Sequence, residues 1–298
     1  MKYGMIGCGE LGAGLALNLL KARFEVMVYD LDAARMQPVL DQGARTAEPA
    51  QMAAQVDAVI TCLPNPKISK ATLDIILPQM AEGKTWIEMS TVSREDILEM
   101  SARAEALGIK TLELPVTGGV HLAHRGEITM LVGGERAVFE EHEPAIQAMG
   151  KEVFLMGPIG SAAIIKVITN MLAFIHLKAD AEALMLAKRG GLDLKTAWEA
   201  IRASSGNSFV HETEGALVLS GSYDVGFNMD LALKDLGFAL GFGREFGVPL
   251  ELASMTEQTY VEAAAAYGRD AQSPMIAKLL EDRLDTDLRA DGFPKRLT

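Results

Sequence analysis

The sequence predicts an α/β domain followed by an all-α domain. In the first half, short β-rich runs alternate with amphipathic helical runs, which is typical of βαβ units around a mostly parallel sheet. After about residue 158 the strand signal stops, and every further periodic segment is helical. We therefore expect an α/β domain over residues 1–157 and an all-helical domain over residues 158–298, joined by a long helix.

The expected elements follow in order along the chain. Strands are expected at residues 3–6, 25–30, 57–64, 85–89, 109–114, 128–134 and 152–156, with amphipathic helices such as 11–22 and 94–108 between them. The later helices are expected at 160–189, 192–204, 229–247, 249–268 and 273–284, separated by the turn sequences GGLD, SSGN, SGSYD and GVP. The helix over 160–189 is apolar on all sides, which predicts burial on every side and association with further copies of the chain.

Composition and charge limit the class of protein. With 49% hydrophobic and 23% charged residues, the chain has the composition of a soluble globular protein. A net charge of −12 argues against nucleic-acid binding, because phosphate neutralisation needs clustered Lys and Arg. Cys8 and Cys62 lie in apolar strand-like runs and fit a reduced compartment. No signal-peptide pattern is visible, and charged residues interrupt the 160–189 run, so we expect a cytoplasmic protein without a membrane segment.

A glycine motif follows the first expected strand. The stretch Gly7-Cys8-Gly9-Glu10-Leu11-Gly12 reads GxGxxG between a strand and a helix. The first glycine makes the turn, the second lets the backbone approach a pyrophosphate, and the third lets helix and strand pack closely. The pyrophosphate then lies at the helix N-terminus, where free N–H groups favour an anion. The sequence therefore predicts a Rossmann-type cofactor site at Gly7, Gly9, Glu10, Leu11 and Gly12.

Asp30 is the candidate residue for holding the adenosine ribose. It follows Gly7 by 23 residues, at the end of the second expected strand, close to the usual spacing of about 20. A carboxylate at this place repels a 2′-phosphate, and no arginine occupies position 31 or 32. We therefore predict NAD as the cofactor, with NADP less favoured; Arg35 is interpreted as a solvated helix residue.

Lys166 stands among isoleucines and valine in the long apolar helix. A lysine is almost never fully buried unless something pairs with it. One interpretation is a stem that covers apolar surface while the amine reaches water. The other is that the amine is needed at this place.

Six segments resemble, in order, the motifs of the β-hydroxyacid dehydrogenase family, which includes 3-hydroxyisobutyrate dehydrogenase and tartronate semialdehyde reductase and is related to 6-phosphogluconate dehydrogenase. They are GCGELGAGLALNLL (7–20), CLPNP (62–66), EMSTVS (88–93), LPVTGG (114–119), GSAAIIKVITN (160–170) and LALKDLGFAL (231–240). The resemblance covers essentially the whole chain. It implies an NAD(P)-dependent oxidoreductase acting on a CH–OH group, assembled as a homodimer or homotetramer.

The resemblance also implies roles for individual residues. Lys166 would be the general acid/base for the substrate hydroxyl, since a lysine desolvated by apolar neighbours has a lowered pKa and accepts a proton near neutral pH. Asn170, on the same helix face, would orient the substrate or the lysine. A turn formed by Thr117, Gly118 and Gly119 would hold the substrate carboxylate. Two loops and a second cation would border the cofactor, namely Leu63, Pro64, Ser90, Thr91 and Lys234. Lys234 would also reach the substrate. No metal is expected.

The departures from the family motifs lie on the substrate side. Residues that differ from the family pattern are Leu114, Thr117, Leu122, Ala162 and Thr169, and two histidines interpreted as surface-loop residues, His121 and His124, flank Leu122. The turn 204–208 resembles a segment that closes the substrate pocket, which makes Phe209 and His211 candidate specificity residues. These changes leave the identity of the substrate open.

Three functions compete. The first is an NAD-dependent dehydrogenase of a small anionic β-hydroxyacid, reversible as a reductase of the matching semialdehyde or keto acid. The second is an imine reductase, and the third is a non-catalytic NAD-binding scaffold. Relatives of the last two kinds lack the lysine, so Lys166 favours the first. Hydroxyisobutyrate, glycerate, threonate, a hydroxymethylglutarate and a sulfonated analogue all remain candidate substrates.

Overall fold

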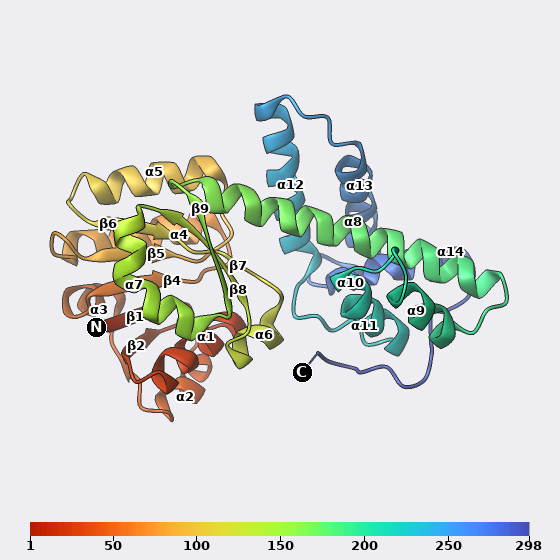
Figure 1. The fold of residues 1–298 in the computed structure, drawn as a ribbon, viewed down its shortest axis with the longest axis horizontal. Coiled ribbons are helices and arrows are strands. Elements are labelled where there is room, and N and C mark those ends of the chain that lie inside the picture. The colour runs from red at the N-terminus through yellow and green to blue at the C-terminus, as the bar shows by residue number, and fades with distance from the viewer. Residues whose placement is uncertain (298) are drawn as a thin grey trace. The chain divides into compact units, whose positions relative to one another are not determined.

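The computed structural model describes residues 1–297 and has two compact units, Met1–Lys166 and the residues from Val167 onward. In the first unit, nine strands form one sheet with helices on both of its faces (Figure 1). The strands are β1 (Lys2–Ile6), β2 (Glu25–Tyr29), β3 (Arg45–Thr46), β4 (Ala58–Thr61), β5 (Thr85–Glu88), β6 (Lys110–Glu113), β7 (Val116–Thr117), β8 (Thr129–Gly134) and β9 (Glu152–Gly157).

The strand order is β3-β2-β1-β4-β5-β6-β8-β7, and β9 pairs with β8. The pairs from β3 to β6 are all parallel, whereas β8 runs antiparallel to both β6 and β7. The predicted α/β domain with a mostly parallel sheet is thus confirmed. The two-residue strands β3 and β7 were not predicted, because so short a segment carries no alternating pattern.

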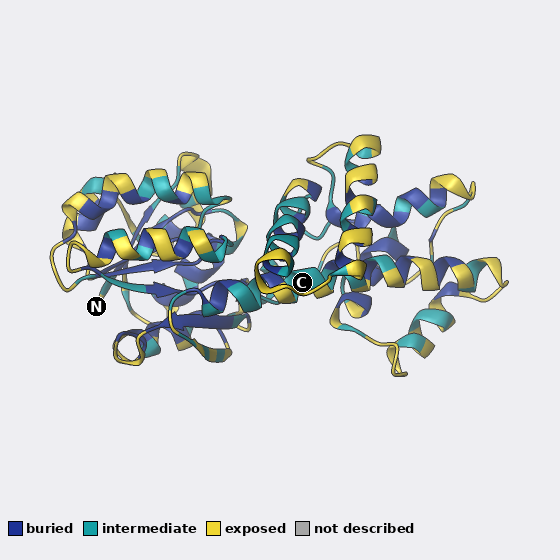
Figure 2. Cartoon of the chain, turned by 90° about the horizontal axis from the view of Figure 1, so that it is seen from above, coloured by how far each residue is buried: buried dark blue, intermediate teal, exposed yellow. Residues whose placement is uncertain are grey.

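The helices of the first unit enclose two separate cores, one on each face of the sheet. They are α1 (Glu10–Lys21), α2 (Ala33–Leu40), α3 (Pro49–Gln55), α4 (Pro66–Ile76), η1 (Leu77–Gln79), α5 (Arg94–Glu105), α6 (Val120–Arg125) and α7 (Arg136–Met149). One core contains buried residues of α1, α2 and α7, and the other contains buried residues of α3, α4 and α5. Successive residues of a strand point to opposite faces, so Met5 lies in the first core and Ile6 in the second. Figure 2 shows the buried strands between helices whose outer sides are exposed.

The carboxyl ends of four neighbouring strands are in register. Ile6 pairs with Thr61, Thr61 with Glu88, and Glu88 with Glu113. The loops that follow these strands therefore begin side by side at one edge of the sheet. The strand order reverses between β1 and β4, and ligands of open α/β sheets bind at such a reversal, beyond the carboxyl ends of the strands.

The second unit is helical, as predicted. Its helices are most of α8 (Ser161–Arg189), α9 (Leu194–Arg202), α10 (Phe209–Glu212), α11 (Glu214–Ser220), α12 (Met229–Phe246), α13 (Glu251–Tyr267), η2 (Ser273–Ala277) and α14 (Lys278–Arg283). Its core includes Phe174, which packs edge-on against Tyr260 with ring centroids 5.4 Å apart. Helices α10 and α11 were not predicted, because four and seven residues are too few to show a helical period.

Helix α8 is 29 residues long, and part of its apolar surface is exposed on the single chain, so its expected burial by further copies of the chain stays a prediction. By length and composition it is apolar enough to cross a membrane, yet only 33% of its most apolar 18-residue window is buried within the chain. Ile168, Leu172 and Leu186 are 37%, 43% and 75% exposed. A core helix of a soluble protein passes the same composition test, so the observation that needs an explanation is its exposed apolar side.

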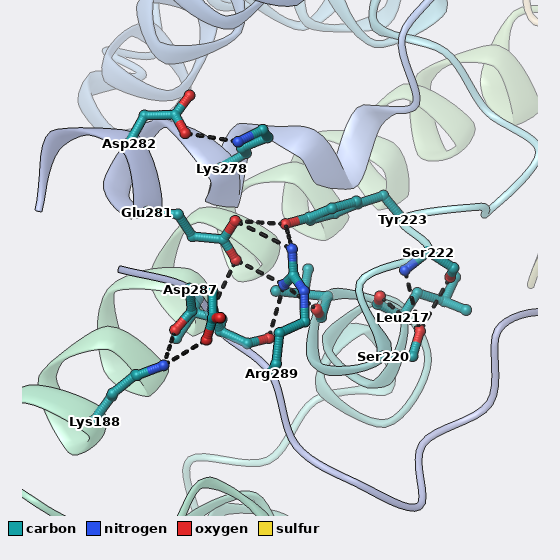
Figure 3. Close-up of polar contacts among 12 residues, drawn as sticks. Lys188, Leu217, Ser220, Ser222, Tyr223, Lys278, Glu281, Asp282, Asp287 and Arg289 are labelled. Atoms are coloured by element: carbon teal, nitrogen blue, oxygen red, sulfur yellow. Dashed lines mark hydrogen bonds and ion pairs between the residues drawn. The ribbon is translucent and has the colours of Figure 1, made fainter. Parts of the chain in front are cut away.

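The C-terminal segment of the second unit is fixed by a polar cluster (Figure 3). Glu281, 2% exposed, accepts hydrogen bonds from the hydroxyl of Tyr223 at 2.7 Å and from Nη1 of Arg289 at 2.8 Å. The guanidinium of Arg289 also lies over the Tyr223 ring, 5.1 Å from its centroid. Lys188 pairs with Asp287 at 2.6 Å. These contacts attach the residues after α14 to the helices.

Candidate active site

The glycine loop after β1 has the geometry that its sequence predicts. Gly7 has φ +100°, and a Cβ added there would lie 2.2 Å from the carbonyl oxygen of Cys62. A Cβ on Gly12 would lie 2.0 Å from the carbonyl oxygen of Gly7, whereas one on Gly9 would meet nothing within 4 Å. Gly7 and Gly12 thus allow close backbone packing, and Gly9 faces open space at the start of α1. These residues fit a dinucleotide pyrophosphate.

Asp30 follows β2 and is held by two backbone amides. The N–H of Cys8 donates to Oδ2 at 2.8 Å, and the N–H of Asp32 donates to Oδ1 at 2.9 Å. The carboxylate is therefore fixed against the glycine loop, where each oxygen keeps a lone pair for a ribose hydroxyl. Leu31 is 91% exposed, and Arg35 pairs with Asp32 at 3.5 Å.

The loops after β4 and β5 are joined through Ser90. Its hydroxyl oxygen accepts a hydrogen bond from the N–H of Leu63 at 2.8 Å and lies 3.3 Å from the hydroxyl of Ser69. Leu63 and Thr91 are partly buried, and Pro64 is exposed. The structure therefore connects two of the loops predicted to border the cofactor, and Ser90 is the residue that connects them.

A buried carboxylate that the sequence did not single out lies beneath these loops. Glu88, 1% exposed, accepts a hydrogen bond from the N–H of Ser90 at 2.7 Å. Burial raises the pKa of Glu88 to about 7, against the lowering effect of its bonds to Ser90. An acid that ends an apolar strand, as in TWIE, was the available signal. Glu88 orders the loop that carries Ser90 and Thr91.

Both cysteines are free thiols close to the cofactor loops. Burial raises the pKa of Cys8 to about 12, and it raises the pKa of Cys62 to about 12 as well. The thiols therefore stay protonated at neutral pH, which fits a packing role.

The predicted substrate turn begins at Thr117, in β7. Gly118 and Gly119 have φ +122° and +94°, values that favour glycine. A Cβ on Gly118 would lie 2.9 Å from the side chain of Leu122, so this departure from the family motif packs against the turn. His121 and His124 lie in helix α6 rather than in a loop, which corrects that interpretation.

Helix α6 is attached to the cofactor-binding helix α1. The side-chain N–H₂ of Asn18 donates to the carbonyl oxygen of Ala123 at 2.7 Å. A Cβ on Gly14 would lie 3.2 Å from the backbone nitrogen of His124, so the two helices approach closely. Asn18 lies in the 7–20 segment but was not among the predicted site residues, and it links the glycine motif to the substrate turn.

Lys166 lies in the second turn of α8 and is partly buried. Ile165 beside it is also partly buried, and Val167 is fully buried. Asn170 lies four residues further along the same helix, which places both side chains on one face.

In the second unit, the structure brings Asn170 and Lys234 to one buried carboxylate. The side-chain N–H₂ of Asn170 donates to Oδ2 of Asp235 at 2.6 Å, and Nζ of Lys234 lies 3.1 Å from Oδ1. Asp235 is 1% exposed, and the Lys234 ammonium lies 5.4 Å from the Phe238 ring centroid. Asp235 belongs to the 231–240 motif, but it was not among the predicted site residues. It orients two predicted substrate-side groups.

His211 is not a specificity residue, contrary to the expectation. It is 1% exposed, its Nδ1 is paired with the carboxylate of Asp180, and its Nε2 lies 2.9 Å from the carbonyl oxygen of Trp198. The ring also stacks on Trp198. Phe209 is 55% exposed, so of this predicted pair only Phe209 has an accessible side chain.

Comparison with known proteins gives matches along nearly the whole chain. A profile of the NAD binding domain of 6-phosphogluconate dehydrogenase matches residues 2–157, and a profile described as NAD-binding of NADP-dependent 3-hydroxyisobutyrate dehydrogenase matches residues 160–280.

Individual relatives match over similar lengths. The chain is 36% identical to 2-(hydroxymethyl)glutarate dehydrogenase of Eubacterium barkeri, over 93% of this chain and 94% of that one. It is 32% identical to L-threonate dehydrogenase of Cupriavidus necator, over 92% and 94%. The crystal structure of 3-hydroxyisobutyrate dehydrogenase from Salmonella typhimurium superposes with a TM-score of 0.87 at 28% identity, covering 94% of this chain and 99% of that chain.

Proposed function

Because the chain belongs to the β-hydroxyacid dehydrogenase family of NAD(P)-dependent oxidoreductases, we propose that it oxidises the CH–OH group of a short β-hydroxyacid with Lys166 as general acid/base. The observation that carries this proposal is the conjunction of a fitted dinucleotide cradle at Gly7, Gly9 and Gly12 with Lys166 in the apolar second turn of α8.

The residues divide the chemistry between them. A nicotinamide held by the glycine loop would supply the acceptor for the hydride that leaves the carbinol carbon. Lys166 takes the hydroxyl proton as the carbonyl forms and returns it in the reverse direction, an assistance worth about 10²–10⁴ in rate. The turn Thr117–Gly119 holds the substrate carboxylate with its hydroxyl and backbone N–H groups. Asp235 orients both Asn170, whose proposed role is to orient the substrate or the lysine, and Lys234, whose proposed role is to reach the nicotinamide or the substrate.

We propose NAD as the preferred dinucleotide. Asp30 is fixed by two amides, and a 2′-phosphate beside this carboxylate and Asp32 would meet two negative charges. Arg35, the nearby cation, is already paired with Asp32.

We propose a dicarboxylic β-hydroxyacid as the substrate to test first. The support is the Eubacterium barkeri relative, whose name specifies 2-(hydroxymethyl)glutarate, a dicarboxylic acid. L-threonate is the second substrate to test, because the Cupriavidus necator relative is named as an L-threonate dehydrogenase.

We propose that a second copy of the chain covers the exposed side of α8, in a homodimer or a homotetramer in the cytoplasm. Ile168, Leu172 and Leu186 are exposed along this helix, and neighbouring exposed apolar side chains are typical of a surface that another protein covers. Size-exclusion chromatography with light scattering, without detergent, should give a multiple of 32.0 kDa. A 32.0-kDa monomer, or a protein that needs detergent, contradicts this assembly.

The test of the function is absorbance at the NADH band with a panel of β-hydroxyacids. Wild-type protein with NAD should oxidise at least one acid, and Lys166→Ala should lose about 10²–10⁴ in kcat while binding NADH equally well. If no acid reacts although NADH binds, imines and semialdehydes are tested next, with NADH as the reductant. Turnover of an imine, or binding without any turnover, contradicts the dehydrogenase.

A further inference from the structure

The first turn of α8 is held by a carboxylate from a distant part of the chain. The N–H of Ala162 donates to Oε1 of Glu113 at 2.8 Å, and the N–H of Ala163 donates to Oε2 at 3.0 Å. Helix N-termini need acceptors for their first N–H groups, and a local Ser, Thr, Asp or Asn usually supplies one. Here the residue before the helix is Gly160, which has no side chain, so Glu113 takes this role from 49 residues away.

The place of Glu113 is built into the sheet. It is the last residue of β6, is 2% exposed, and pairs in register with Gly133 of β8. A Cβ on Gly133 would lie 2.1 Å from Oε1 of Glu113, so only glycine leaves room for the carboxylate there. Burial raises the pKa of Glu113 to about 7, against the lowering effect of the backbone amides of α8.

Glu113 also connects two parts of the reaction site along the chain. Four residues after it comes Thr117, the first residue of the substrate turn. Lys166 lies four residues after Ala162, which is about 6 Å along the helix axis and on the same helix face. A shift or rotation of the first turn therefore moves the amine of Lys166 by a comparable amount.

We propose that Glu113 is a positioning residue for the reaction, because its two oxygens fix the first turn of α8 and thereby the place of the Lys166 amine. This rests on the proposed role of Lys166. Glu113 acts through the lysine and touches neither substrate nor cofactor. Reacting groups must be held within about 0.5 Å, and a displacement of 1 Å costs on the order of a hundredfold in rate.

The test compares Glu113→Leu, which keeps the volume but removes both acceptors, with Glu113→Gln, which keeps one. We expect kcat to fall about 10- to 100-fold in the Leu variant and less in the Gln variant, with KM and the Kd for NADH nearly unchanged. Gly133→Ala displaces the carboxylate without replacing it and should lower kcat in the same direction. If Glu113→Leu does not fold, Gly133→Ala takes its place in the test.

Glu281→Gln is the matched control, because Glu281 is also 2% exposed and also accepts a backbone N–H, that of Leu288. It should lower the Tm and leave kcat unchanged. A kcat loss in the control as large as in the Glu113 variants would mean that any buried-carboxylate change lowers activity, and would overturn the proposal.

The double variant separates positioning from a general structural effect. If Glu113 acts through the lysine, Glu113→Leu should cause no further loss in a Lys166→Ala background. A loss of the same factor in both backgrounds, or a Kd for NADH that rises in step with the fall in kcat, overturns the proposal. If Glu113→Leu keeps the wild-type kcat while Lys166→Ala is inactive, the positioning role of Glu113 is overturned and the proposed function is not. A wild-type kcat in Lys166→Ala overturns the proposed function and this role together.

Discussion

The two units of this chain bury carboxylates in different ways. In the α/β unit, Glu88 accepts a hydrogen bond from the backbone amide of Ser90, and Glu113 accepts two from the backbone amides at the start of α8. In the helical unit, Glu281 is paired with Arg289, and Asp180 with His211. The first kind lies at the carboxyl edge of the sheet, beside the proposed cofactor loops and the start of α8. The second kind joins helices and the C-terminal segment.

This difference separates groups that serve the site from groups that serve the fold. A buried carboxylate without a cationic partner carries a desolvation cost that raises its pKa, whereas a paired one is compensated by a cation. In the α/β unit, Glu88 and Glu113 carry this desolvation cost at the places where they hold the loop after β5 and the start of α8. In the helical unit, removal of one partner leaves an uncompensated buried charge.

The largest effect is expected at His211. Both of its ring nitrogens face acceptors, so the ring must carry two protons. Burial lowers the pKa of His211, but the bonds to Asp180 and Trp198 outweigh it and raise the pKa above the usual 6.5. His211→Leu leaves Asp180 unpaired and should cost about 3–5 kcal/mol in the free energy of unfolding at pH 6.

The pH dependence of this cost has a defined sign. A raised pKa in the folded state means that the contribution of His211 is complete below pH 6.5 and is lost as the pH rises through the folded pKa. Urea titrations at several pH values check this, with the exposed His176→Gln as control. A His211→Leu protein as stable as wild type at pH 6 contradicts the buried ion pair.

A smaller effect, of opposite sign in the two units, is expected when buried glutamates become glutamines. Glu88→Gln removes a buried charge at high pH. Because the folded pKa of Glu88 is raised from 4.5 to about 7, its stabilising contribution is complete below pH 4.5 and is lost by about pH 7. The variant should therefore gain up to about 3 kcal/mol at pH 8 and nothing at pH 4.5. Glu281→Gln leaves Arg289 with a weaker partner and should be less stable at pH 8.

Urea unfolding of both glutamine variants at pH 4.5 and pH 8 provides the measurement. Destabilisation of Glu88→Gln at pH 8 would mean that its hydrogen bonds outweigh the cost of burying the charge. The proposed distinction between the two units would then be wrong for this residue.

The smallest effect concerns Asp30, the half-buried carboxylate of the cofactor loop. Asp30→Asn loses the charge that accepts ribose hydroxyls and repels a 2′-phosphate, so the Kd for NAD should rise about tenfold or more. Leu31→Arg added to this variant should shift the preference toward NADP, because Leu31 is 91% exposed and an arginine there can reach a phosphate. Fluorescence titration with NADH and NADPH checks both expectations. Equal affinities of the wild type for the two dinucleotides would contradict the role given to Asp30.

The local parts of this fold and site could be predicted from the sequence, and the distant contacts could not. Strand, turn and helix signals act over a few residues. They were therefore enough to predict the glycine motif, the two fold types and the boundaries of α8 to within one residue. Glu113 was missed because its partners Ala162 and Ala163 lie 49 and 50 residues away. His211 was misassigned because nothing near it in the sequence reveals its pairing with Asp180.

The most direct test of the central claim is rescue of Lys166→Ala by an added amine. Since the proposed task of Lys166 is to take the hydroxyl proton, a small amine in solution should restore part of the lost turnover in proportion to its concentration, and wild-type protein should not respond. Turnover by Lys166→Ala at the wild-type rate without any amine would contradict the account.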